Sequence, residues 1–126
     1  MTDDQNQDLE WEASRERHYR KIKIWVPGAN NTTRTIKLRY RVQDALRFFE
    51  EHDELYWNVT GDEWEVPIQR ASAMVILPRG AEGLRADGFT GSYGSVEKAL
   101  SVEELDQGFV FEATRSLNFR EGLTVV

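Results

Sequence analysis

Hydrophobic and polar residues alternate along much of this chain, and the alternation predicts strands rather than helices. Residues 20–26, RKIKIWV, and residues 35–42, TIKLRYRV, each place every second side chain on one face. A period of two is typical of a half-buried strand. The inward positions would be Ile22, Ile24, Val26, Ile36, Leu38, Tyr40 and Val42. Turn-forming residues, PGANNTTR, connect the two segments, so we expect them to pair as an antiparallel hairpin.

Strand patterns recur through the rest of the sequence. Residues 54–60 alternate with Trp57 inward, and residues 71–78, ASAMVILP, are apolar on both faces, which is typical of a central strand. Further strands are predicted at 109–117 and 122–126. With a short strand in the glycine-rich segment between them, the total is about seven short strands separated by turns. The expected fold is therefore an all-β, immunoglobulin-like antiparallel β-sandwich.

The length of 126 residues suits one domain with a single core. The first fourteen residues lack periodicity and are rich in acids, so we expect a flexible lead-in over 1–14 and a single sandwich domain over 15–126. Within that lead-in, Leu9 and Trp11 are candidates for pairing onto a sheet edge. One helical turn is expected after Ser101, where the sequence SVEEL has the spacing of a capping box.

The amino-acid composition excludes several kinds of site and argues against one class of partner. Without cysteine, the chain has no disulfide, thiolate zinc site or thiol catalysis. The only histidines, His18 and His52, lack metal-ligand spacing, and no serine lies in a recognisable nucleophile setting, so we predict no metal, no cofactor and no catalytic residue. A net charge of −6 argues against nucleic acid as a partner. No apolar run reaches the roughly 18 residues of a membrane span, so the chain as given is expected to be soluble.

Residues 52–68, HDELYWNVTGDEWEVPI, concentrate aromatic and acidic side chains. Aromatic rings beside carboxylates are what a carbohydrate platform requires, so Asp53, Tyr56 and Trp64 are the candidate ligand-binding residues. The acids Asp53, Glu54, Asp62, Glu63 and Glu65 leave calcium binding and glycoside hydrolysis open as alternatives. The interpretation we favour is structural, with Trp57 in the core and the whole stretch serving as a keystone of the fold.

A second candidate surface is basic. If the predicted hairpin forms, the outward residues make one positive face: Lys21, Lys23, Lys37, Arg39 and Arg41. Such a face could bind anionic lipid head groups or envelope polymers. The alternatives are that these residues pair with the acids near residues 50–54, or that another part of a longer protein covers them.

Several of these segments resemble one family. DELYWNVTG at 53–61, then Trp64, then Val66-Pro67-Ile68 and a strand ending in Leu77-Pro78 are similar to the signature of the domain of unknown function 2207 family. IKLRYRV, FTGSYGS and ATRSLNFREGLTVV extend the resemblance over about residues 20–126. This family comprises predicted membrane proteins of bacteria and archaea.

The resemblance implies an extracytoplasmic β domain followed by transmembrane helices in a longer parent. The family's usual start and its membrane segments are absent from the sequence, so we expect a piece of a larger protein with truncated, exposed sheet edges. The leading hypothesis is a noncatalytic sensing, binding or adhesion module. The alternatives are a carbohydrate-active or cell-wall hydrolase using acids near 53–65, and a structural domain that forms homo-oligomers through its sheet edges.

Overall fold

The computed structural model describes residues 1–17 and 19–126, and within them it contains strands and no helix. All paired strands are antiparallel. The all-β prediction is confirmed, and the sheets are consistent with a β-sandwich, while the immunoglobulin-like topology stays a prediction. His18, considered above as a candidate ligand, lies outside the described residues.

The chain divides into two compact units, Met1–Gln43 and Asp44–Val126, here called unit 1 and unit 2. The expected domain boundary after residue 14 stays a prediction. Residues 10–14 belong to a regular strand, because they pair along their length with the segment around Ile22.

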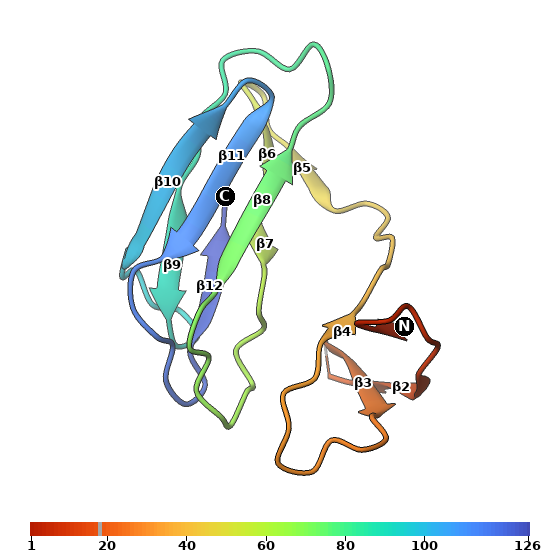
Figure 1. The fold of residues 1–126 in the computed structure, drawn as a ribbon. Helices are drawn as coiled ribbons and strands as arrows, with labels where there is room; N and C mark the ends of the chain where they lie inside the picture. Colours follow the sequence, from red (N-terminus) through yellow and green to blue (C-terminus); the bar gives the residue numbers. More distant parts are fainter. Residues whose placement is uncertain (18) are drawn as a thin grey trace. The chain divides into compact units, whose positions relative to one another are not determined.

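The described residues of unit 1 form four strands, β1 (Thr2–Asp3), β2 (Glu10–Glu16), β3 (Tyr19–Trp25) and β4 (Ile36–Lys37). β2 pairs with β3, and β1 pairs with β4 (Figure 1). The predicted hairpin between 20–26 and 35–42 is therefore wrong, although the pairing considered for Trp11 is present, opposite Ile24. Closing the short connection between β2 and β3 costs less chain entropy than closing the long loop to β4.

Of the two faces of unit 1 that were predicted to point inward, one is half-buried and the other is exposed. Ile22, Ile24 and Val26 are half-buried and alternate with exposed neighbours, as expected. The second set is exposed, which contradicts the prediction: Ile36, Leu38, Tyr40 and Val42. The reason is that β4 covers only two residues, and that Leu9 is the one buried apolar side chain among the described residues of unit 1.

Unit 2 contains two three-stranded sheets and one hairpin. The first sheet has the order β10, β11, β8 and the second the order β7, β12, β9. The hairpin joins β5 to β6. The bounds are β5 (Leu46–Phe48), β6 (Asp53–Leu55), β7 (Trp57–Asn58), β8 (Ser72–Ile76), β9 (Gly88–Gly91), β10 (Leu100–Leu105), β11 (Gly108–Ala113) and β12 (Gly122–Val125).

The core of unit 2 is made chiefly by β11 and β12. Phe109 and Phe111 alternate inward from β11 and pack with Val125 of β12, while Leu123 of β12 packs with Leu117. Trp57 packs against the phenylalanine cluster, which confirms its predicted core position. Gly108 permits β8 and β11 to approach closely, because a side chain there would overlap the carbonyl oxygen of Val75.

Two local predictions in unit 2 are wrong. Residues 101–104 lie in strand β10 rather than a helical turn, because the whole segment pairs with β11 and this ladder overrides a local capping signal. β8 is an edge strand rather than a central one, and its residues Met74 and Ile76 are exposed. An apolar run fits an edge strand whose outer face is uncovered as well as a buried strand, so sequence alone did not distinguish them.

Candidate functional site

Three loops meet at one end of unit 2, here called the loop end: residues 59–71, 92–99 and 114–121. Figure 1 shows them below the two sheets, where β8 and β12 begin and where β9 and β11 finish. The pairing of Gly91 with Gly122 brings the second and third loops together at this end. Segments far apart in sequence thus share one surface.

The first loop begins with a tight turn that the sequence fixes by hydrogen bonds. The Thr60 hydroxyl accepts a bond from the Leu123 N–H at 3.0 Å and donates to the Gly61 carbonyl at 2.9 Å. Gly61 has φ of 76°, a conformation that favours glycine. The Trp64 indole N–H donates to the Thr60 carbonyl at 2.7 Å. These bonds fix the turn and set the direction of the Trp64 ring, and the keystone role of residues 52–68 stays a prediction.

A shallow, mostly apolar concavity lies on the same loop. Its volume is about 390 Å³, and it is lined by Thr60, Trp64, Val66, Pro67 and Ile68. Trp64 is 55% exposed and Val66 is 60% exposed. Because the indole N–H is already bonded within the chain, the indole can meet a ligand through its ring surface.

The backbone of the third loop supports this concavity. The Ile68 and Leu117 N–H groups each donate to the other's carbonyl at 2.8 Å, and the Arg120 N–H donates to the Trp64 carbonyl at 2.9 Å. Leu117 is fully buried. The apolar wall is thus anchored to the core through a neighbouring loop rather than by contacts of its own segment alone.

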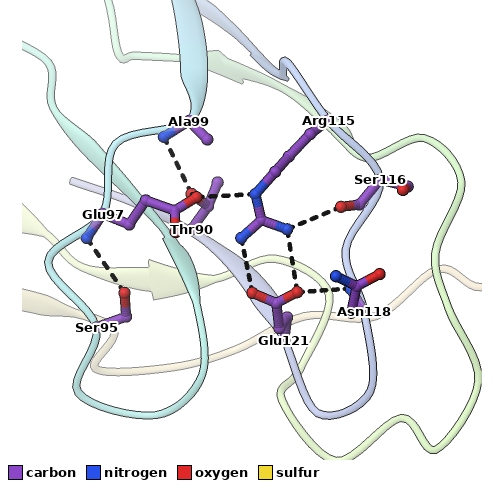
Figure 2. Close-up of polar contacts among 8 residues, drawn as sticks. All are labelled: Thr90, Ser95, Glu97, Ala99, Arg115, Ser116, Asn118 and Glu121. Carbon is purple, nitrogen blue, oxygen red and sulfur yellow. Dashed lines mark hydrogen bonds and ion pairs between the residues drawn. The ribbon is translucent and has the colours of Figure 1, made fainter.

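Arg115 connects the third loop to the second loop, and it also binds Glu121, the residue before β12. Figure 2 shows its guanidinium between two glutamates. Its Nε donates to Glu97 at 2.8 Å, and Nη1 and Nη2 donate to the two carboxylate oxygens of Glu121 at 3.0 and 2.7 Å. Nη1 also donates to the Ser116 carbonyl at 2.8 Å. A bidentate pair of this kind is directional as well as favourable.

Further bonds complete this network around the two glutamates. Glu97 accepts a bond from the Thr90 hydroxyl at 3.1 Å, and the Thr90 hydroxyl accepts the Ala99 N–H at 3.0 Å. Glu121 accepts the Asn118 N–H at 2.7 Å. Glu97 is therefore held by donors from β9 and the third loop, whereas both donors to Glu121 belong to the third loop itself.

These donors change the proton affinities of the network. The Arg115 side chain, with the Asn118 N–H at one of the two sites, holds the pKa of Glu121 and of Glu97 below the ordinary glutamate range. The two carboxylates in turn raise the pKa of Arg115. At neutral pH the network is fully ionised, so these carboxylates are suited to holding loops rather than to donating protons.

The predicted ligand-binding residues do not gather into one site. Asp53 lies on β6 opposite Phe48, and Tyr56 follows that strand, exposed, with the Arg47 guanidinium 5.4 Å from its ring. In Figure 1 the β5–β6 hairpin lies at the end of unit 2 opposite the loop that carries Trp64. His52 stacks on Phe49 with ring centroids 4.9 Å apart.

The residues of the predicted basic face are also separated. Lys21 lies 3.5 Å from Glu16, and Lys23 lies on β3 opposite Glu12, with its ammonium 4.8 Å from the Trp25 ring. Lys37 lies on β4 and donates to Asn6, and Arg39 and Arg41 are exposed beyond that strand. Without the predicted hairpin, these five cations belong to two separate sheets and to the segment after β4.

Sequence reasoning missed the Arg115 network. Glu97 lies in the second loop, and it becomes a neighbour of Arg115 and Glu121 in the third loop only after β9 pairs with β12. No spacing in the sequence marks them. Among residues 1–17 and 19–126, no group of three or more His, Asp or Glu side chains could hold a metal ion, and no helix is long and apolar enough to cross a membrane.

Comparisons with known proteins identify the family. No curated protein and no solved structure matches the chain. The family model for the predicted membrane protein (DUF2207) N-terminal domain matches residues 4–126. That match covers nearly the entire sequence, and the chain therefore belongs to the DUF2207 family of predicted membrane proteins, as part of its N-terminal domain.

Proposed function

We propose that this chain is a noncatalytic binding module of a larger membrane protein, held outside the cytoplasm, which binds a glycan of the cell envelope at its loop end. The observation that carries this proposal is the half-exposed Trp64 ring, fixed by its own N–H bond beside an apolar concavity. The resemblance of the sequence to its family supports the extracytoplasmic side.

A fixed, exposed indole suits a sugar ring. Pyranose rings have an apolar face of C–H groups that packs on an aromatic plane, while their hydroxyls need polar partners at the edge. Glu63 and Glu65, which flank Trp64 in the same loop, are both exposed and can accept hydrogen bonds from such hydroxyls. Because the ring is held before binding, less conformational entropy is lost when the ligand arrives.

The hydrolase alternative has less support. Glycoside hydrolysis uses two carboxyl groups roughly 5 to 10 Å apart, one of them a proton donor whose pKa is raised. The acids of β6 and those beside Trp64 belong to segments at opposite ends of unit 2. At the loop end, the pKa values of Glu97 and Glu121 are lowered, which is the opposite of what a general acid requires.

Tryptophan fluorescence tests the proposal. Chitooligosaccharides and soluble peptidoglycan fragments should give a saturable shift in the tryptophan emission of the wild-type chain. Trp64→Ala should lower the affinity about tenfold or more, as expected for an aromatic anchor that the bound ligand covers. Trp25→Ala, which removes a tryptophan of unit 1, is the matched control and should leave the affinity unchanged.

Two outcomes would overturn this assignment. One is a wild-type chain that binds anionic vesicles and none of the glycans. The other is glycan binding that Trp64→Ala and Trp25→Ala affect equally. A Trp64→Phe variant preserves an aromatic plane without the N–H donor, so it separates loss of stacking from loss of the turn.

A further inference from the structure

Strand β8 is an edge of its sheet, since the order is β10, β11, β8. The bonds at its two ends show which backbone groups are used. The Leu77 N–H donates to Gln107 at 2.8 Å, and the Ala113 N–H donates to Ala71 at 2.9 Å. N–H and C=O groups alternate in direction along an antiparallel strand. Odd-numbered residues of β8 therefore face β11, and the backbone groups of Ser72, Met74 and Ile76 face outward.

The side chains of this edge are uncharged, and all except Ser72 are apolar. Met74 is 66% exposed and Ile76 is 62% exposed, and the whole strand reads SAMVI. Protein edges that stay single usually contain charges, proline or a bulge, which block pairing with another chain. Between Ser72 and Ile76 none of the side chains is charged and none is proline.

The other edges of unit 2 differ from β8. The opposite edge of the same sheet, β10, contains the consecutive acids Glu103 and Glu104. In the second sheet, β7 is only two residues long, and Thr90 of β9 bonds on its outer side to Glu97. These edges are acidic, short or already covered, so β8 is the edge of the two three-stranded sheets best suited to recruit another strand.

We propose that two copies of this chain pair antiparallel through β8 about a twofold axis at Met74. In this register Met74 faces Met74 of the second copy, and Ser72 faces Ile76. All outward N–H and C=O groups of these three residues then find partners. No like charges oppose each other within the strand, so a second copy complements this edge. The acidic β10 strands form the outer edges of the joined sheet, which limits the assembly to two copies.

A single cysteine tests the register, because the natural chain has none. Directly opposed residues in a hydrogen-bonded antiparallel pair have Cα atoms about 5.5 Å apart, within the range of roughly 4.4–6.8 Å that a disulfide spans. Met74→Cys should therefore form a covalent dimer under mild oxidation. Ser72→Cys is the matched control, since its two copies would lie more than about 13 Å apart, and it should remain monomeric.

Light scattering of the chain over a range of concentrations supplies the second test. The mass should rise from 14.6 kDa towards twice that value. Met74→Pro should abolish the rise, because it removes an outward N–H that the ladder with β11 does not use. Met74→Lys should do the same through charge repulsion, and it serves if the proline variant does not fold. Glu103→Gln, on the other edge, should leave the rise unchanged.

Each outcome of the cross-linking and light-scattering experiments either supports or contradicts the proposed dimer. Dimerisation that Met74→Lys removes, together with cross-linking at position 74 and not at 72, supports the proposal. A mass that stays at the monomer value at every concentration would overturn it. So would a dimer that persists in Met74→Lys, or cross-linking that is equal at positions 72 and 74, because either result places the contact elsewhere.

Discussion

Units 1 and 2 are both built from antiparallel strands, yet they bury their side chains very differently. In unit 2, side chains from two sheets meet and exclude water, and Leu117 and Leu123 are completely buried. Among the described residues of unit 1, Leu9 is the one buried apolar side chain, and strand β2 is exposed along its whole length. Alternation produces strands in both units, but only a facing layer turns an apolar face into a core.

The difference implies that the two units draw on different sources of stability. A hairpin such as β2–β3 has cross-strand pairs and backbone bonds but little apolar burial, and isolated two-stranded hairpins are marginal in water. Unit 2 adds the hydrophobic term, which is worth roughly 25 cal/mol for each Å² of apolar surface removed from water. We therefore expect amides of unit 1 to exchange with solvent much faster than those of β11 and β12.

The largest expected effect comes from matched leucine truncations, one in each unit. Leu123→Ala should lower the free energy of unfolding of unit 2 by about 2–5 kcal/mol, because Leu123 is 0% exposed and truncation leaves a cavity. Leu38→Ala, at a side chain that is 46% exposed, should change stability by no more than about 0.5 kcal/mol. Denaturant unfolding followed by circular dichroism measures both values. Equal effects would mean that the segment around Leu38 is buried in solution.

The same contrast shows what the sequence could reveal. Periodicity located the strand around Ile22 and Ile24, the inward Trp57, and the last strands of the chain. It failed on pairing, because the alternation of residues 35–42 says nothing about which strand, or whether any layer, will lie opposite. A local pattern fixes the face of a strand, whereas its partner depends on loop entropy and on the rest of the chain.

The sequence likewise predicted only part of the candidate site. Trp64 was proposed as a candidate from its aromatic and acidic neighbours in the sequence. Asp53 was grouped with Trp64 because the two residues are only eleven positions apart in one aromatic, acidic stretch. The β5–β6 hairpin and the first loop nevertheless lie at opposite ends of unit 2. The Arg115 network was not predicted, since Glu97 and Arg115 meet only through the β9–β12 pairing.

An intermediate effect is expected from the Arg115 network, and it should depend on pH. Arg115→Met should lower stability by about 1 kcal/mol at pH 7, since the guanidinium is partly exposed and screened by water. The pKa of Glu121 is lower in the folded state than its ordinary value of 4.5. Its contribution is therefore complete above that ordinary value and is lost as pH falls through the folded pKa.

Thermal melts of wild type and Arg115→Met at a series of pH values test this sign. The two melting temperatures should differ at pH 7 and converge as the glutamates become protonated in acid. Arg79→Met, at an exposed arginine in another loop of unit 2, is the control and should melt like wild type at every pH. A difference that persists unchanged below the folded pKa would show that Arg115 acts through packing of its methylene groups rather than through the ion pairs.

The smallest effect is expected in unit 1, where a polar side chain rather than an apolar one organises the chain. The buried Asp3 carboxylate accepts the Gln5 and Gln7 N–H groups at 2.9 and 2.8 Å. Asp3→Ala should leave both donors without this acceptor at a local cost of about 1 kcal/mol, visible as faster exchange of the two amides. Asp3→Asn preserves an acceptor oxygen, so the same two amides should exchange more slowly in Asp3→Asn than in Asp3→Ala.

The melting temperature of unit 2 should be the same in all three chains, because its core shares no residue with this turn. If Asp3→Ala lowered that temperature, the two units would unfold cooperatively, and their stabilities could not be assigned to separate sources.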